Sequence, residues 1–280
     1  MPRLSLSTWS IHRPLGLGYG PADDGIGRLV PDQDEPGSHS LLAVPSRMAA
    51  HGVNTLEICH FHFPSTDQSY LDELRTSLDE AGVELFSILI DAGDITAEDM
   101  TQRDADLDWI REWLDVAGGC GASHARIIAG QTDVEGTAHG DWRDHPVIRM
   151  SADHLKMLAA YGQDCGVQVI TENFRALTKR PEQVLAILDL CEEQVGLCAD
   201  YGNYGGPTKY DDLTAILPYA DSIHAKPEYP NGVMDRTDFN RCLDLSRDAR
   251  FDGPYSLIFE GSSGEWDHLN EIRDVVKAYV

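Results

Sequence analysis

The sequence contains very little lysine and a large excess of acid. Of its 280 residues, 5 are Lys and 17 are Arg, against 31 Asp and 16 Glu, and the formal net charge is −25. A surface this negative repels the phosphate backbone of DNA or RNA, so we expect no nucleic-acid partner. The chain has no run of about 18 apolar residues, which argues against a membrane-spanning helix. Its first residues, MPRLSLSTWSIH, lack the apolar core of a signal peptide. These absences predict a cytoplasmic protein that does not bind membranes.

Closely paired cysteines and a dinucleotide fingerprint are also missing. The six cysteines include no CxxC pair, which is typical of buried thiols that stay reduced inside the cell. No GxGxxG motif follows the first predicted strand, and this argues against a doubly wound open sheet, the main alternative fold. No cluster of Arg or Lys marks a phosphate site, which favours a substrate without phosphate.

Strand-like and helix-like patterns alternate along almost the whole chain. Strands are predicted at residues 3–9, 53–58, 83–90, 125–129, 167–172, 195–200, 222–225 and 255–260. Helices are predicted at residues 40–51, 68–81, 105–120, 146–165, 181–193, 210–217, 238–248 and 266–279. Eight βα units in succession predict an α/β protein with a closed (β/α)8 barrel, a TIM barrel, as one domain over residues 1–280. Residues 12–39 are rich in Gly, Pro and Asp and form a long loop insertion after strand one, of the kind that often serves as a lid.

Four short phrases at the ends of the last four predicted strands carry potential metal ligands. They are VITEN with Glu172, LCADYGN with Asp200, SIHAKPE with His224 and SLIFEG with Glu260. The intervals of 28, 24 and 36 residues each match about one βα unit, so on parallel neighbouring strands the four side chains would meet. They would meet at the C-terminal mouth of the barrel, where the active sites of this fold lie.

Each of these four residues also has a purely structural explanation, as a cap, a core histidine or a surface acid. Together they are more specific, because crowded carboxylates repel one another unless a divalent cation lies among them. Three carboxylates and one imidazole form a hard, oxygen-rich set. Such a set favours Mn²⁺ or Mg²⁺, with Co²⁺ as a common substitute, over a thiolate-type zinc site. We therefore expect a divalent metal ion, Mn²⁺ in the first place.

The Glu–Asp–His–Glu order, with ADYGN around Asp200 and HAK around His224, resembles the xylose-isomerase-like sugar isomerase/epimerase superfamily over residues 3–280. The resemblance implies a metal-dependent isomerase or epimerase that acts on a sugar or a related polyhydroxy carbonyl compound through a cis-enediolate. It implies that Glu172 and Glu260 bind the metal and exchange protons on opposite faces of the substrate. Asp200 and His224 carry over as ligands only.

Three positions depart from the pattern of the ketose 3-epimerases in this superfamily. Asn203 stands where they usually have a histidine, and Thr178 stands where they have a second glutamate. The stretch KPEYPNG lacks their arginine, so the usual contacts to a free ketohexose are missing. The endonuclease IV branch needs a histidine at the position of Asn203 and a further Asp-x-His. The segment Asp235-Arg236-Thr237 does not supply the latter, which argues against DNA repair.

Other residues near the predicted mouth are candidates for substrate contact. In LEICHFHFP, at the end of the second strand, His60 and His62 would form a polar pocket with aromatic walls. The alternative is that Phe61 and Phe63 pack a loop while the histidines bond the backbone. Lys226 would neutralise an enediolate oxygen or pair with Glu228. The remaining candidates for substrate contact are Trp9, His12, Asn173, Arg175 and Asn203.

Two other functions remain open at this level. One is a lyase on the same barrel, a metal-dependent dehydratase of a keto-polyol, which starts from the same enediolate. The other is a non-catalytic sugar-binding or partner subunit with a structural metal. The presence of both Glu172 and Glu260 disfavours a pure scaffold, which has no need of two acid/base groups. The sequence predicts a small sugar-like partner and leaves a homo-oligomer open.

Overall fold

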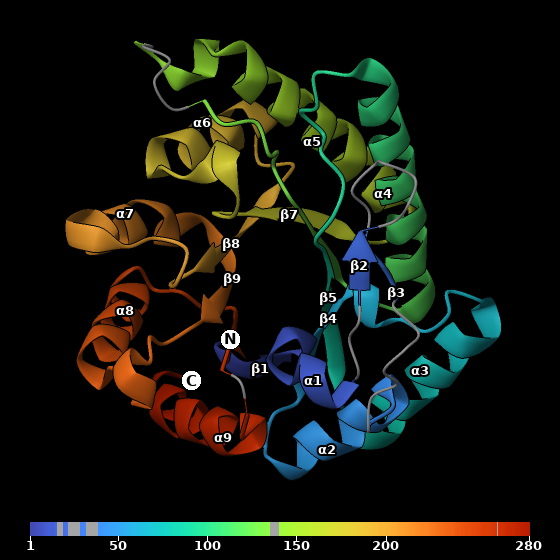
Figure 1. Cartoon of the computed structure of the whole chain (residues 1–280), viewed down its shortest axis with the longest axis vertical. Coiled ribbons are helices and arrows are strands. Elements are labelled where there is room, and N and C mark those ends of the chain that lie inside the picture. Colours follow the sequence, from blue (N-terminus) through green and yellow to red (C-terminus); the bar gives the residue numbers. More distant parts are fainter. Residues whose placement is uncertain (16–18, 22–28, 32–38, 135–139, 262) are drawn as a thin grey trace.

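The structure is a closed barrel of eight parallel strands with helices around its outside (Figure 1). It is a computed structural model that describes residues 1–15, 19–21, 29–31, 39–134, 140–261 and 263–280. The barrel strands are β1 (Arg3–Ser7), β4 (Thr55–Cys59), β5 (Glu84–Ile90), β6 (His124–Ile127), β7 (Gln168–Glu172), β8 (Gly196–Asp200), β9 (Ala220–Ala225) and β10 (Pro254–Leu257). They follow one another around the ring in chain order, and β10 pairs with β1 to close it. The predicted (β/α)8 fold is confirmed.

The outer layer consists of helices that follow the barrel strands along the chain. They are α2 (Val44–Ala50), α3 (Gln68–Ala81), α4 (Met100–Cys120), α5 (Pro146–Asp164), α6 (Pro181–Cys191), α7 (Lys209–Ile216), α8 (Arg236–Asp248) and α9 (Glu265–Val276). Helix α4 begins earlier than the apolar pattern predicts because the Asp99 carboxylate caps it, accepting hydrogen bonds from the N–H groups of Thr101 and Gln102. Among the described residues, no helix combines the length and the apolar character needed to cross a membrane.

Most of the predicted insertion at residues 12–39 lies outside the described residues. Its described parts are α1 (His12–Leu15) and an antiparallel pair formed by β2 (Tyr19–Pro21) and β3 (Leu29–Pro31). In Figure 1 this pair lies on the side of the barrel where β4 and β5 stand, and β3 comes close to the 3₁₀ turn His60–His62. The idea that the insertion acts as a lid stays a prediction.

The site rests on a small apolar floor inside the barrel. Most apolar side chains lie between the strands and the helices, but Phe86, Ile170 and Cys198 form a separate buried cluster. Side chains on a strand alternate between its two faces, so residues two apart lie on the same face. Glu172 follows Ile170 by two positions on β7, and Asp200 follows Cys198 by two on β8. The fold therefore places both carboxylates on the inner face, one layer above the apolar floor.

Candidate metal and substrate site

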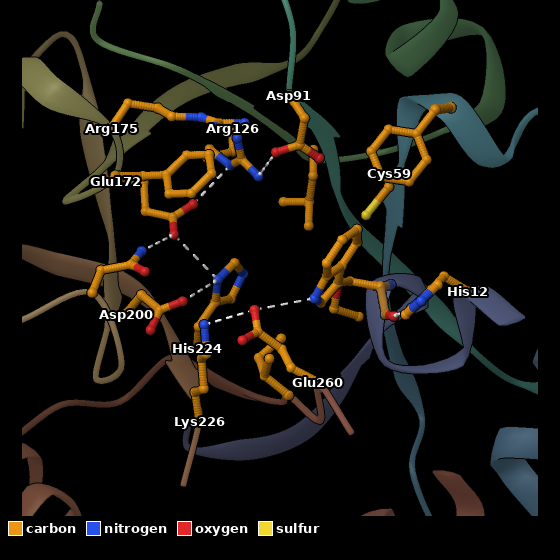
Figure 2. A pocket seen from close by; sticks show the side chains of 17 residues that line it. His12, Cys59, Asp91, Arg126, Glu172, Arg175, Asp200, His224, Lys226 and Glu260 are labelled. Atoms are coloured by element: carbon orange, nitrogen blue, oxygen red, sulfur yellow. Dashed lines mark hydrogen bonds and ion pairs between the residues drawn. The ribbon is translucent and has the colours of Figure 1, made fainter. Parts of the chain in front are cut away.

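A cavity of about 520 Å³ opens at the C-terminal ends of the barrel strands (Figure 2). This volume is typical of sites for small molecules. All four predicted ligands line the cavity: Glu172, Asp200, His224 and Glu260. Trp9, His12, Asn203, Arg175 and Lys226, which were predicted to contact substrate, line it as well.

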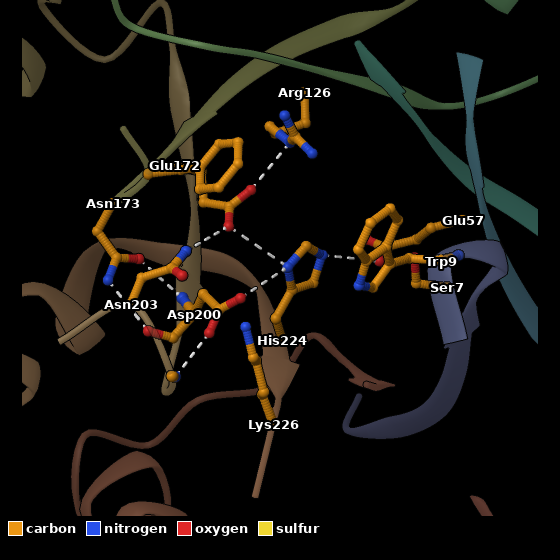
Figure 3. A network of polar contacts seen from close by, with 12 residues as sticks. Ser7, Trp9, Glu57, Arg126, Glu172, Asn173, Asp200, Asn203, His224 and Lys226 are labelled. Carbon is orange, nitrogen blue, oxygen red and sulfur yellow. Dashed lines mark hydrogen bonds and ion pairs between the residues drawn. The ribbon is translucent and has the colours of Figure 1, made fainter. Parts of the chain in front are cut away.

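Two carboxylates converge on one ring nitrogen of His224 (Figure 3). Its Nδ1 lies 3.5 Å from Oε1 of Glu172 and 3.4 Å from Oδ2 of Asp200. Its other nitrogen, Nε2, lies 3.1 Å from Oε2 of the fully buried Glu57, which accepts the Nε2–H. With the proton of a neutral imidazole on Nε2, the lone pair of Nδ1 faces two carboxylate oxygens. Three lone pairs that face one another repel unless a cation or a proton lies between them, so this donor set fits a divalent metal ion.

The pKa shifts of His224 and Asp200 also indicate that a positive charge is favoured near Nδ1 of His224. Burial alone would lower the pKa of His224, but the surrounding negative groups, among them Glu172 and Glu57, raise it well above its usual value. Burial alone would raise the pKa of Asp200, but the hydrogen bond from His224 and the charge of Lys226 lower it. The site is therefore organised to hold a positive charge, as a proton on Nδ1 or as a cation in its place.

The Glu172 carboxylate is held from two sides. Its Oε1 accepts a hydrogen bond of 2.9 Å from the Nδ2 amide of Asn203. Its Oε2 is ion-paired with Nε of Arg126 at 2.9 Å, and Arg126 also donates to Oδ1 of Asp91 at 2.6 Å. Burial alone would lower the pKa of Arg126, but the negative charges of Asp91 and Glu172 outweigh this effect and raise the pKa above its usual value. This buried network was not predicted, although an arginine inside the apolar strand HARII was a signal for it.

Asn173 holds the other carboxylate ligand in place. Its Nδ2 donates to the carbonyl oxygen of Asp200 at 3.0 Å, and its Oδ1 accepts from the N–H of Asp200 at 2.8 Å. Both polar atoms of the buried amide are therefore used on the backbone of β8. The prediction that Asn173 contacts substrate is corrected: this residue joins the end of β7 to the end of β8.

Glu260 reaches the cavity from beyond the last strand. Strand β10 ends at Leu257, earlier than predicted, and the Glu260 side chain is 49% exposed. Its Oε1 accepts from Nζ of Lys226 at 2.7 Å and from Nε1 of Trp9 at 3.3 Å. Lys226 thus pairs with Glu260 and not with Glu228. Three of the four predicted ligands lie together around Nδ1 of His224, while the Glu260 carboxylate is paired with Lys226 and, in the view of Figure 2, lies beyond the His224 ring from Glu172.

The family model for the xylose isomerase-like TIM barrel matches residues 45–271. The chain belongs to this family. No functionally curated protein matches the sequence.

Several solved structures share the fold over nearly the full chain. A magnesium complex of a xylose isomerase-like TIM barrel protein from Mycobacterium smegmatis is 16% identical, with a TM-score of 0.66, covering 99% of this chain and 98% of the other. D-psicose 3-epimerase with D-tagatose, from Clostridium cellulolyticum H10, is 12% identical with a TM-score of 0.69 and the same coverage. The probable 3-DHS dehydratase AsbF from Bacillus anthracis is 14% identical, with a TM-score of 0.68 and 98% coverage of both chains. At these identities the similarity establishes the fold alone.

In this xylose isomerase-like barrel, His60 and His62 do not line the cavity, which corrects their predicted place in a polar pocket. The 3₁₀ turn after β4 directs the Phe61 ring into the cavity and the two imidazoles away from it. Nδ1 of His60 accepts from the N–H of Asp91 at 3.2 Å, and Nδ1 of His62 lies 2.7 Å from Oγ1 of Thr8. Burial lowers the pKa of His60 to about 4 and that of His62 well below its usual value. Both are neutral supports behind the aromatic wall.

Cys198 lies beside the candidate ligands of the xylose isomerase-like site, a position that the sequence analysis did not assign. Ligand atoms of Glu172, Cys198 and His224 all lie within 4.8 Å of one another. Burial raises the pKa of the Cys198 thiol to about 11, so the group is protonated at neutral pH. Together with its place in the apolar floor, this makes Cys198 part of the base of the site. The period of two on β8 was the signal, because Cys198 precedes Asp200 by two residues.

Proposed function

We propose that this protein is a divalent-metal-dependent isomerase or epimerase of a sugar or related polyhydroxy carbonyl compound. The observation that carries the proposal is the convergence of Glu172 Oε1 and Asp200 Oδ2 on Nδ1 of His224. Family membership supports it. The proposed metal ligands are Glu172, Asp200, His224 and Glu260.

The oxygen-rich donor set favours Mn²⁺, with Mg²⁺ or Co²⁺ as substitutes. When bound, such an ion polarises the substrate carbonyl and stabilises the negative charge of an enediolate. For Glu260 to join the ligand set, its carboxylate has to turn away from Lys226, a movement that its exposed position after β10 permits. Lys226 is then free to donate a hydrogen bond to a substrate oxygen.

Glu172 and Glu260 are the proposed proton-transfer groups. They approach the cavity from β7 and from the segment after β10, with His224 between them in the view of Figure 2. A substrate in the cavity then has a carboxylate on each side. One carboxylate removes the proton beside the carbonyl, and return of a proton by the other on the opposite face inverts that carbon. The carboxylate of Glu172 is fixed by Arg126 and Asn203, which orients it for this transfer.

The wall opposite the polar groups suits the apolar face of a sugar ring. Trp9 and Phe61 meet edge to face, with ring centroids 6.1 Å apart, and both line the cavity. Trp9 is also stacked on His12 at 4.8 Å, which holds its indole in position. We assign Trp9 to substrate stacking and Asn203 and Lys226 to hydrogen bonds with substrate oxygens. His60 and His62 have no place in this assignment.

Solvent exchange tests the reaction type. The purified protein, loaded with Mn²⁺, is incubated in D₂O with a panel of aldoses, ketoses and sugar acids. We expect deuterium at the carbon next to the carbonyl in recovered substrate and product, detected by mass spectrometry and NMR. A product that absorbs in the ultraviolet, together with loss of water, would identify a dehydratase instead. Absence of exchange and of turnover across the panel, with metal bound, would favour a non-catalytic sugar-binding subunit.

Replacement of Glu57 by Gln is expected to weaken metal binding about 10- to 100-fold, the usual effect of losing a charged partner behind a ligating histidine. Gln has nearly the same shape and still accepts the hydrogen bond from Nε2 of His224, so the change isolates the charge. Affinity for Mn²⁺ is measured by isothermal titration calorimetry. Glu84→Gln is the control, since Glu84 pairs with Arg3 at the opposite end of the barrel. Equal affinities in the two variants would contradict the proposed role of Glu57.

A further inference from the structure

Arg175 is a positive charge in the cavity wall to which no carboxylate of the described residues is paired. Its side chain is exposed and lines the same cavity as Glu172, and among the described residues it forms no ion pair. The other two basic residues of the cavity are both paired, Arg126 with Asp91 and Glu172, and Lys226 with Glu260. The chain has 47 acidic residues, yet this cavity-lining arginine has no ion pair among the described residues. It is therefore a candidate for binding an anionic ligand.

The backbone at Arg175 is held in a conformation that favours glycine. Its φ is 73° and its ψ is −173°, a region in which a side chain is strained. The chain on both sides is anchored: the hydroxyl of Thr178 donates to the carbonyl of Phe174 at 2.7 Å and contacts that of Glu172 at 3.2 Å. The turn is therefore determined by its neighbours, and glycine would fit it better. Strain of this kind tends to persist where the side chain has a function.

The ring of Phe174 fixes the direction of the arginine. The guanidinium carbon of Arg175 lies 4.4 Å from the centroid of this ring, and that of Arg126 lies 5.5 Å from it. Stacking on a ring leaves the N–H groups along the edge of the guanidinium available, in the fork geometry that matches a carboxylate. Figure 2 shows Arg175 on the Glu172 side of the cavity. An anion bound here would lie beside the proposed reaction site.

We propose that Arg175 binds a carboxylate of the substrate, so that the substrate class is a polyhydroxy carbonyl compound with a carboxylate, a sugar acid. The assignment rests on the proposed function for the rest of the substrate. A single fork-shaped cation suits a monoanion, whereas a phosphate dianion would require further unpaired basic groups. Arg126 does not provide one because Asp91 and Glu172 already neutralise it, and Lys226 is assigned to a substrate oxygen on the Glu260 side of the cavity.

Matched ligands and variants test the assignment. Gluconate and sorbitol share a six-carbon polyol chain and differ by the carboxylate, and sorbitol 6-phosphate supplies the phosphate alternative. Binding of each is measured by calorimetry, with Mn²⁺ and with EDTA, to wild type and to Arg175→Gln. The control is Arg250→Gln, because Arg250 is another exposed arginine with positive φ (60°) but lies away from the cavity.

We expect wild type to prefer gluconate over sorbitol about 10- to 100-fold, the usual effect of a charge-assisted hydrogen bond, with or without Mn²⁺. Arg175→Gln should lose this preference without a change in sorbitol affinity, while Arg250→Gln keeps it. Arg175→Gly should lose the preference too, yet unfold at the same or a higher temperature than wild type because the backbone strain is relieved.

Equal affinity of wild type for gluconate and sorbitol would overturn the proposal. So would a gluconate preference that survives Arg175→Gln, or tighter binding of sorbitol 6-phosphate that depends on Arg175. Because binding is measured without turnover, these outcomes leave the solvent-exchange test untouched. A carboxylate preference without any deuterium exchange would, conversely, reject the proposed function and keep the anion site.

Discussion

Replacement of Glu172 by Gln is expected to lower kcat/KM by about 10³-fold or more, equivalent to about 4 kcal/mol of transition-state stabilisation. The amide loses the charge that faces Nδ1 of His224 and cannot accept a proton from substrate. General acid–base catalysis alone accounts for about 10²- to 10⁴-fold in rate, and weakened metal binding adds to the loss. Activity is measured on the substrate found by solvent exchange, and bound Mn²⁺ by elemental analysis of the same samples.

The control for this variant is Glu80→Gln, an exposed glutamate on α3. It makes the same chemical change on the outside of the barrel and should behave as wild type. Circular dichroism of the metal-free Glu172 variant checks that it folds, since Arg126 keeps its ion pair with Asp91, and this separates loss of chemistry from loss of fold. Wild-type metal content together with more than a tenth of wild-type activity would contradict the role assigned to Glu172.

Replacement of Arg126 by Met is expected to lower the free energy of unfolding by about 3–5 kcal/mol. The side chains of Arg126 and Glu172 are 4% and 3% exposed, so the change leaves the carboxylates of Glu172 and Asp91 without their cation in a buried site. Removing one partner of a buried pair is costly because the remaining charge is desolvated without compensation. Chemical unfolding of the metal-free protein, followed by circular dichroism, measures the effect.

Two further variants separate charge from packing. Asp91→Asn in the Arg126→Met background removes one of the two uncompensated charges and should recover part of the lost stability. Arg143→Met breaks an exposed pair with Asp141 and should change stability little. Added Mn²⁺ should also raise the unfolding temperature of Arg126→Met more than that of wild type, because the ion replaces the missing positive charge beside Glu172. An Arg126→Met protein as stable as wild type would show that the ion pair contributes nothing.

The order of strands and the positions of three candidate ligands could be read from the sequence because they depend on local patterns. An apolar run predicts a strand, and Glu172, Asp200 and His224 each stand at the end of such a run. In a parallel barrel, that position alone determines which end of the molecule a residue occupies. Contacts across the barrel depend on which strands face each other in three dimensions. The pair Glu57–His224 is of this kind, since it joins β4 to β9, and no local pattern predicts it.

The errors at the ends of strands have a common physical cause. Apolar residues continue past Leu257 because Ile258 and Phe259 are still buried, although the ladder has ended. The apolar pattern therefore predicted a longer strand and placed Glu260 at its end. At β4 the residue types were right for a pocket, but a 3₁₀ turn replaces the alternation of a strand. The turn places the aromatic ring of Phe61 in the cavity wall, where the two histidines were predicted, and directs the two imidazoles away from the cavity.

The complete site forms only when the barrel closes, that is, when β10 pairs with β1. The Ser10 hydroxyl donates to the carbonyl of Leu257 at 3.0 Å and accepts from the N–H of Phe259 at 2.9 Å, and Trp9 donates to Glu260 across 251 positions of sequence. Glu172, Asp200 and His224 lie on adjacent strands, so a partly folded chain can assemble them early. Contacts between distant parts of a chain form late, since their loop-closure entropy is large. With the proposed ligand set, metal affinity should therefore rise in two stages during refolding. The first stage is the assembly of Glu172, Asp200 and His224, and the second is the addition of Glu260 when β10 pairs with β1.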